Sequence, residues 1–195
     1  DEILESLNLL LIGDSIAVDV TDDFYEMFPN SVSDTKIGRI TSLGKQVLDS
    51  YIDEKKWEGE GVIFASLSNS PINGELEDIR EKIGKDMPLF LTTVRIPHDT
   101  FEDESNSKIK KFVEENDHTY LIDWYAASEG HDEYFDADDT HLLSAGAKAY
   151  ANCIKEAVLD AYKKENIEIP KSRLVSSTDT STDSSNDSST NASTE

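Results

Sequence analysis

Residues 7–15, Leu7-Asn8-Leu9-Leu10-Leu11-Ile12-Gly13-Asp14-Ser15, decide the fold of this 195-residue chain. The apolar run predicts a buried strand, the glycine ends it, and Ser15 stands at the start of a predicted helix. Gly-Asp-Ser is also an ordinary turn sequence, since glycine accepts positive φ and Asp or Ser caps a following helix. The functional interpretation is that the turn presents a serine hydroxyl, which a nearby base could activate.

Short apolar segments alternate with helical patterns along the rest of the chain. The predicted strands cover residues 7–12, 32–37, 61–66, 89–94 and 119–123. The predicted helices cover residues 16–28, 43–53, 75–83 and 106–116, with a last helix after Ser144 as its N-cap. Continuously apolar strands separated by helices are typical of a parallel sheet covered on both faces. We therefore expect an α/β three-layer sandwich with a five-stranded parallel sheet, strand order 2-1-3-4-5 (flavodoxin-like), and a ligand crevice at the carboxyl ends of the strands.

Composition limits the classes of partner. The chain has 41 acidic and 18 basic residues, for a formal net charge of −23. Such a surface repels phosphate backbones, so we expect no nucleic-acid partner. The single cysteine, Cys153, excludes an internal disulfide framework and a cysteine-rich metal site. No apolar run approaches the roughly 18 residues of a membrane-spanning helix.

The organisation of the chain changes near its end. Between residues 176 and 195, 18 of 20 residues are Ser, Thr, Asn or Asp, which cannot bury apolar surface. We therefore predict one domain over residues 1–170 and a disordered tail over residues 171–195. Because the chain begins at Asp1 instead of methionine, we also expect it to be a piece of a longer protein.

The second informative segment is Asp138-Asp139-Thr140-His141, just before the last predicted helix. An imidazole can remove the proton of a serine hydroxyl, and it does so best when a carboxylate orients it. Either aspartate could be that carboxylate on composition alone. A metal site is the rival interpretation of this acidic region, whose possible ligands are Glu129, His131, Asp132, Glu133, Asp136, Asp138, Asp139 and His141. Their spacing matches no recognised metal-binding loop, so we predict no metal.

Four segments together resemble the SGNH (GDSL-type) hydrolase superfamily, over roughly residues 7–162. The matching segments are Gly13-Asp14-Ser15-Ile16, Lys36-Ile37-Gly38-Arg39, Ala65-Ser66-Leu67-Ser68-Asn69 and Asp138-Asp139-Thr140-His141. The resemblance implies an SGNH hydrolase fold and catalysis without a cofactor. It assigns Ser15 as nucleophile, His141 as base and Asp138 as the carboxylate that orients the base, and it assigns an oxyanion hole to Ser15, Gly38 and Asn69.

The third of these segments departs from the superfamily pattern, because Leu67 stands where a glycine is usual. Gly38 and Asn69 also have ordinary explanations, as a loop glycine and as a turn residue. The departure keeps open a catalytically silent SGNH-like domain that binds glycan.

A more specific resemblance is carried by the segments 123–125, 128–135, 138–142 and 146–151, with support from 36–39 and 92–97. They look like the extracytoplasmic SGNH domain that follows an integral-membrane acyltransferase domain in Gram-positive peptidoglycan O-acetyltransferases. One departure is that the aromatic expected soon after Pro97 is Phe101, four residues on.

This second resemblance implies a serine-dependent O-acetyltransferase that passes an acetyl group to a cell-wall glycan, at the C6 hydroxyl of a muramoyl residue. The implied acetyl donor is delivered by an N-terminal integral-membrane domain absent from this chain. The implied location is the extracellular face of the Gram-positive cell membrane, as the soluble C-terminal part of a membrane protein. A secreted carbohydrate or acetyl esterase of the same fold is the alternative.

Overall fold

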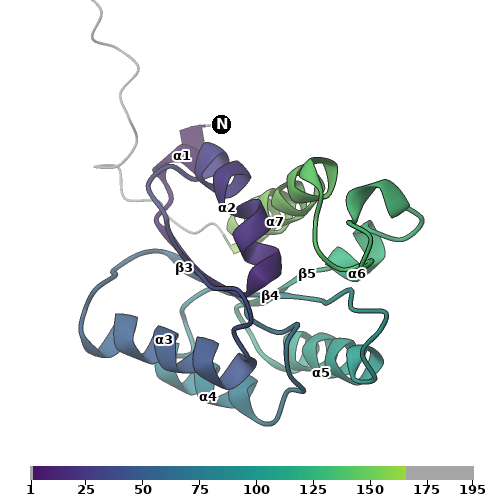
Figure 1. Ribbon diagram of the computed structural model, residues 1–195. Helices are drawn as coiled ribbons and strands as arrows, with labels where there is room; N and C mark the ends of the chain where they lie inside the picture. Colours follow the sequence, from purple (N-terminus) through teal and green to yellow (C-terminus); the bar gives the residue numbers. More distant parts are fainter. Residues whose placement is uncertain (1, 166–195) are drawn as a thin grey trace, which may run out of the picture.

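The computed structural model describes residues 2–165, which form a parallel sheet between two layers of helices (Figure 1). The strands are β1 (Leu9–Gly13), β2 (Val32–Thr35), β3 (Gly61–Ala65), β4 (Leu89–Thr92) and β5 (Thr119–Ile122). The helices are α1 (Glu2–Ser6), α2 (Ser15–Met27), α3 (Thr41–Asp53), α4 (Glu75–Ile83), α5 (Glu102–Glu115), α6 (Trp124–Ala127), the 3-10 helix η1 (Asp132–Tyr134) and α7 (Ser144–Glu165).

The sheet has the strand order β2-β1-β3-β4-β5, and every pairing is parallel. This confirms the predicted fold class and strand order. β1 and β3 are buried along their whole length, as expected for central strands covered on both faces. Gly13 at the end of β1 pairs with Thr35 of β2 and Ala65 of β3, so the loops after these three strands leave the sheet side by side.

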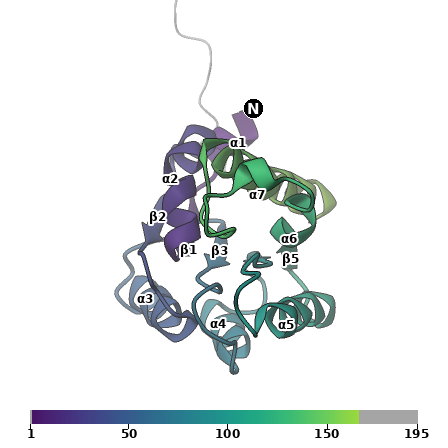
Figure 2. The same ribbon diagram turned by 45° about the vertical axis from the view of Figure 1, so that its right-hand side comes forward.

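Two apolar cores lie on opposite faces of the sheet. One core joins the sheet to α1, α2 and α7, and the other joins it to α3, α4 and α5. Figure 2 shows these two helix layers above and below the strands. Among residues 2–165, none of the helices combines the length and apolar character that crossing a bilayer requires.

Element boundaries differ from the sequence prediction in small ways. α5 begins at Glu102 instead of residue 106, and its first turn carries Glu102, Asp103 and Glu104, which favour a helix N-terminus. Ser144 is the first residue of α7 and not the cap before it. The short elements α1, α6 and η1 were not predicted. The predicted domain boundary at residue 170 and the predicted tail over residues 171–195 lie outside the described residues.

Candidate active site

Ser15 is the first residue of α2, directly after the turn that ends β1. The carboxylate of Asp14 caps this helix by accepting a hydrogen bond from the Ile16 backbone N–H at 3.1 Å. Ser15 follows the strand-to-helix turn directly, and the residue is 6% exposed. Its own N–H lies at the helix start, where backbone donors lack intrahelical partners.

Hydrogen bonds connect Ser15 to His141 and His141 to Asp138, in that order. His141 Nε2 lies 3.0 Å from Ser15 Oγ, although the two residues are 126 positions apart in the chain. On the other side of the ring, His141 Nδ1 lies 2.5 Å from Asp138 Oδ2. With the Nδ1 proton donated to Asp138, Nε2 presents a lone pair to the serine hydroxyl.

Asp138 and Asp139 have different partners. Asp138 Oδ1 also accepts the backbone N–H groups of Thr140 and His141, so its carboxylate is oriented from two directions. Asp139 has a positive φ of 57°, and its Oδ2 lies 3.1 Å from His98 Nε2. The geometry therefore sets Asp138 against the imidazole and directs Asp139 away from it.

The electrostatics of these residues suit a base and its orienting acid. Hydrogen bonds from the His141 ring and backbone lower the pKa of Asp138 to about 2, so this carboxylate is ionised at neutral pH. The same ring contact raises the pKa of His141 above its usual 6.5, with smaller contributions from Asp19 and Asp14. Burial raises the pKa of Asp14, the cap of the serine-bearing helix.

Gly38 lies in the exposed turn that follows β2, next to the end of β1. Its φ is +71°, which favours glycine, and the turn is closed by the Arg39 N–H donating to the Lys36 carbonyl at 3.2 Å. Arg39 is buried, and its guanidinium donates to the Gly13 carbonyl at 3.1 Å and to Asp34. The turn that carries Gly38 is thereby fixed to the strand that delivers Ser15.

Asn69 lies in the loop after β3, and its side chain is exposed. Asp14 Oδ2 accepts the Ser68 backbone N–H at 2.9 Å, which ties this loop to the serine turn. The Asn69 amide donates to the Arg39 carbonyl at 3.3 Å. Leu67, the residue at the usual glycine position, is fully buried in the core against α3–α5, so it anchors the loop instead of occupying the crevice.

The described part of the chain contains no cluster of side chains that would support the rival metal interpretation. No group of three or more His, Cys, Asp or Glu within residues 2–165 could hold a metal ion. His131 instead stacks on Tyr134 at 4.4 Å between ring centroids and contacts Glu133 at 2.8 Å. Trp124 packs against Tyr134 and Phe135, which supports the segment leading to Asp138 and His141.

Sequence reasoning missed the contacts that three residues make around the site: Arg39, His98 and Asp19. Asp19 Oδ2 accepts the backbone N–H of Leu142 at 3.0 Å. Asp19 follows Ser15 by four positions in a predicted helix, a spacing that places both on one helix face and was a usable signal. The contacts of Arg39 and His98 depend on the meeting of separate loops and leave no local pattern.

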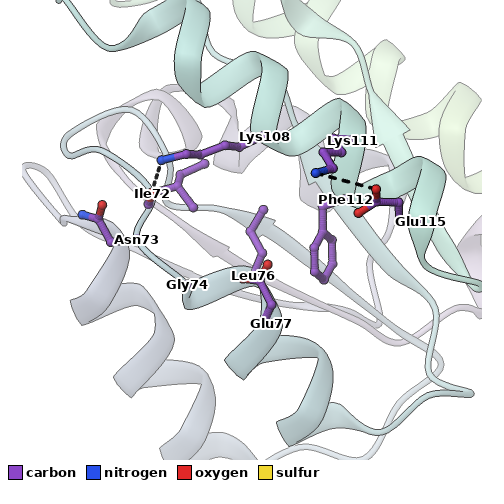
Figure 3. Close-up of a pocket in the computed structure, with 9 residues that line it drawn as sticks. All are labelled: Ile72, Asn73, Gly74, Leu76, Glu77, Lys108, Lys111, Phe112 and Glu115. Carbon is purple, nitrogen blue, oxygen red and sulfur yellow. Dashed lines mark hydrogen bonds and ion pairs between the residues drawn. The ribbon is translucent and has the colours of Figure 1, made fainter.

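A separate hollow of about 280 Å³ lies between α4 and α5 (Figure 3). Its two lysines already have protein partners: Lys108 Nζ donates to the Ile72 carbonyl at 2.7 Å, and Lys111 Nζ lies 3.8 Å from Glu115 Oε1. Neither Ser15 nor His141 lines it. We assign it no part in the chemistry of the serine site.

Comparisons with known proteins identify the fold of this chain. No family model matches the chain. The C-terminal catalytic domain of peptidoglycan O-acetyltransferase A (OatA) from Streptococcus pneumoniae superimposes with a TM-score of 0.72 at 21% identity, over 80% of this chain and 94% of that one. A lipase/acylhydrolase from Enterococcus faecalis superimposes with a TM-score of 0.63 at 17% identity, over 85% and 99%. The chain has the SGNH hydrolase fold.

Sequence similarity relates the chain to one group of proteins with this fold. The O-acetyltransferase OatA of Staphylococcus aureus is 34% identical over 146 residues, which are 74% of this chain and 24% of the relative. The chain is thus an OatA-like domain, homologous to the C-terminal catalytic domain of Gram-positive peptidoglycan O-acetyltransferases. It spans about a quarter of the length of the curated relative that it matches.

Proposed function

We propose that this domain is a serine-dependent O-acetyltransferase that moves an acetyl group through an acetyl-Ser15 intermediate to a cell-wall glycan hydroxyl, the C6 hydroxyl of a muramoyl residue. The observation that supports it is the hydrogen-bonded line Ser15–His141–Asp138 in a chain homologous to OatA. This arrangement supplies a nucleophile, a base and an orienting carboxylate.

In the first step, His141 Nε2 takes the proton of the Ser15 hydroxyl while Oγ attacks the carbonyl carbon of an acetyl ester. The oxyanion of the tetrahedral intermediate accepts hydrogen bonds from the N–H groups of Ser15 and Gly38 and from the Asn69 amide. For this, Asn69 exchanges its contact with the Arg39 carbonyl for one with the oxyanion. Collapse breaks the bond to the donor oxygen, which leaves as an alcohol with the proton from His141.

In the second step, His141 removes the proton of the acceptor hydroxyl, whose oxygen attacks the acetyl-Ser15 carbonyl. A second tetrahedral intermediate collapses, the Ser15 oxygen leaves, and His141 returns the proton to it. Asp138 remains ionised throughout and stabilises the imidazolium that forms in each step.

The alternative function is that of an acetyl esterase, in which water replaces the sugar hydroxyl. The openness of the site favours this possibility, because the side chains of His141 and Asp138 are 45% and 50% exposed. The balance between transfer and hydrolysis depends on how a bound acceptor excludes water from acetyl-Ser15.

The proposed setting follows from the length of the relative. Because the match covers 24% of OatA, most of that protein lies outside the matched region. We propose that a longer parent protein carries an N-terminal integral-membrane acyltransferase domain, which delivers the acetyl donor to this domain at the extracellular face of the membrane.

The deciding experiment is mass spectrometry of the protein and the sugar after incubation with an activated acetyl ester, with and without a chitooligosaccharide or muropeptide acceptor. We expect acetyl-Ser15 to form and the ratio of acetylated sugar to free acetate to rise with acceptor concentration, in ping-pong order. Ser15→Ala is the control and should give neither product above background.

Two other results would redirect the assignment. A ratio that stays at zero with good acceptors while hydrolysis proceeds would make the domain an esterase. Failure of Ser15 to acetylate, or to react with a serine-directed phosphonate, would favour a silent glycan-binding domain.

A further inference from the structure

Two contacts join the serine-bearing helix to the histidine-bearing loop. Ser15 and Asp19 lie on α2 four residues apart, and His141 and Leu142 are neighbours in the loop before α7. Ser15 Oγ lies 3.0 Å from His141 Nε2, and Asp19 Oδ2 accepts the Leu142 N–H at 3.0 Å. The Ser15–His141 contact and the Asp19–Leu142 contact therefore join the same helix to the same loop, one helical turn apart.

The histidine loop needs such a contact because much of it is exposed. The side chains of residues 136–139 are all exposed, and that of His141 is only half-buried. Within the loop, the Asp136 N–H donates to the His141 carbonyl at 2.9 Å, which shapes it but does not place it against α2. A second contact comes from outside the loop. His98, in the loop after β4, places its Nε2 3.1 Å from Asp139 Oδ2.

We propose that Asp19 is a positioning residue: its carboxylate holds the Leu142 backbone and thereby sets the imidazole of His141 at hydrogen-bonding distance from Ser15. The inference rests on the proposed roles of Ser15 and His141 and adds a residue that touches neither the acyl group nor the acceptor. The physical reason is that α2 is a rigid element, so a second attachment one turn from Ser15 restricts rotation and sliding of the loop.

The charge of Asp19 has a second effect on the same ring. The carboxylates that act on His141 are Asp138 on its own loop, and Asp19 and Asp14 from the α2 side. All three favour the imidazolium that forms when Ser15 is deprotonated. An amide at position 19 would keep an oxygen acceptor for the Leu142 N–H but remove the charge, whereas alanine would remove both.

The test compares Asp19→Ala and Asp19→Asn with the matched control Asp22→Ala, an exposed aspartate of the same helix. The measurements are kcat, KM and the pH profile of kcat/KM for hydrolysis of p-nitrophenyl acetate, with Tm as a check of folding. We expect Asp19→Ala to lower kcat about 10- to 100-fold with little change in KM. Asp19→Asn should retain most of kcat at high pH, with the rising limb of its profile moved to lower pH. Asp22→Ala should change neither quantity.

A second arm repeats Asp19→Ala in a His141→Ala background. If Asp19 acts through His141, the residual rate should be the same with and without Asp19. Wild-type kcat in Asp19→Ala, an equal loss in the Asn and Ala variants, or an undiminished effect without His141 would each overturn the inference. If the alanine variant does not fold, Asp19→Asn decides: a rising limb of its kcat/KM profile at the wild-type pH would overturn the inference. Failure of the proposed function is distinguishable: turnover that persists in Ser15→Ala would show that the serine takes no part, and hydrolysis without acetylated sugar would make the domain an esterase while leaving the Asp19 effects in place.

Discussion

The neighbouring aspartates 138 and 139 show how backbone conformation separates two identical side chains. Asp138 faces the His141 ring and accepts three hydrogen bonds from it and from adjacent N–H groups. Asp139, in a left-handed conformation, reaches His98 instead. One residue of displacement thus distinguishes a carboxylate that orients a base from one that joins two surface loops.

This difference gives a direct prediction for activity. Ser15→Ala and His141→Ala should each lower ester turnover by about three orders of magnitude or more, since the members of such a group act as a unit. Asp138→Asn should cost less than either, and Asp139→Asn, the matched control, should cost little. Initial rates with p-nitrophenyl acetate measure all four variants. Comparable losses in Asp138→Asn and Asp139→Asn would contradict the assignment of Asp138.

A pH profile tests the same contact by another route. Activity requires neutral His141, so kcat/KM should rise with pH through a pKa displaced upward from 6.5 and be lost as pH falls through it. Asp138 stays ionised over this range because its pKa is about 2. Asp138→Asn removes the largest cause of the upward displacement, so its rising limb should move to lower pH. An unchanged limb would mean that another group controls the profile.

At the scale of elements, the packing of α7 on η1 supports the histidine loop. An added Cβ at Gly146 would lie 2.2 Å from the Tyr134 carbonyl oxygen, so only glycine permits this approach. The same carbonyl accepts the Leu143 N–H at 2.9 Å, and Phe135 forms an isolated antiparallel bridge with Leu142. The position of the loop between residues 135 and 142 therefore depends on how closely α7 packs.

Gly146→Ala should consequently destabilise the domain, although alanine is the better helix former. We expect a loss of about 1–3 kcal/mol from overpacking, with reduced ester turnover because Tyr134 and the attached loop must shift. Lys148→Ala, an exposed position on the same helix, is the control and should change the unfolding free energy by no more than about 0.5 kcal/mol. Denaturant unfolding and initial rates measure both effects, and a stabilised Gly146→Ala would refute the packing argument.

At the scale of the whole molecule, the end of α7 packs into the apolar core on one face of the sheet. Val158, Ala161 and Tyr162 are buried there, and the Tyr162 hydroxyl donates to the Glu60 carbonyl at 2.9 Å. The helix thus closes the layer that also contains α1 and α2.

Removal of residues 171–195 should therefore leave the unfolding free energy within about 0.5 kcal/mol of the full chain and leave ester turnover unchanged. The reason is the near absence of apolar residues from that segment. Truncation after residue 157 should instead unfold the domain, since it removes the buried residues of the last turns. Thermal and denaturant unfolding distinguish the two. A large loss on removing 171–195 would move the predicted domain boundary.

The sequence by itself determined the α/β class, the strand order and the location of the serine at the end of β1. Hydrophobic patterns are local and repeat along each element, so they can be recognised without knowing what packs against them. The same patterns place element ends less well, because pairing with a neighbour ends a strand: β1 covers Leu9–Gly13 where residues 7–12 were predicted. Short elements such as α6 and η1 contain too few residues to show a period.

Only the tertiary structure decided how the candidate residues face one another. It turned the Asn69 amide toward the Arg39 carbonyl and brought Asp19 to Leu142, whereas the pairing of Asp138 with His141 was already an expectation from the superfamily pattern. The Asn69 and Asp19 contacts join segments that are 30 and 123 residues apart in the chain. Each is fixed by the packing of whole elements and by single φ values, neither of which is encoded in a local pattern of residue types.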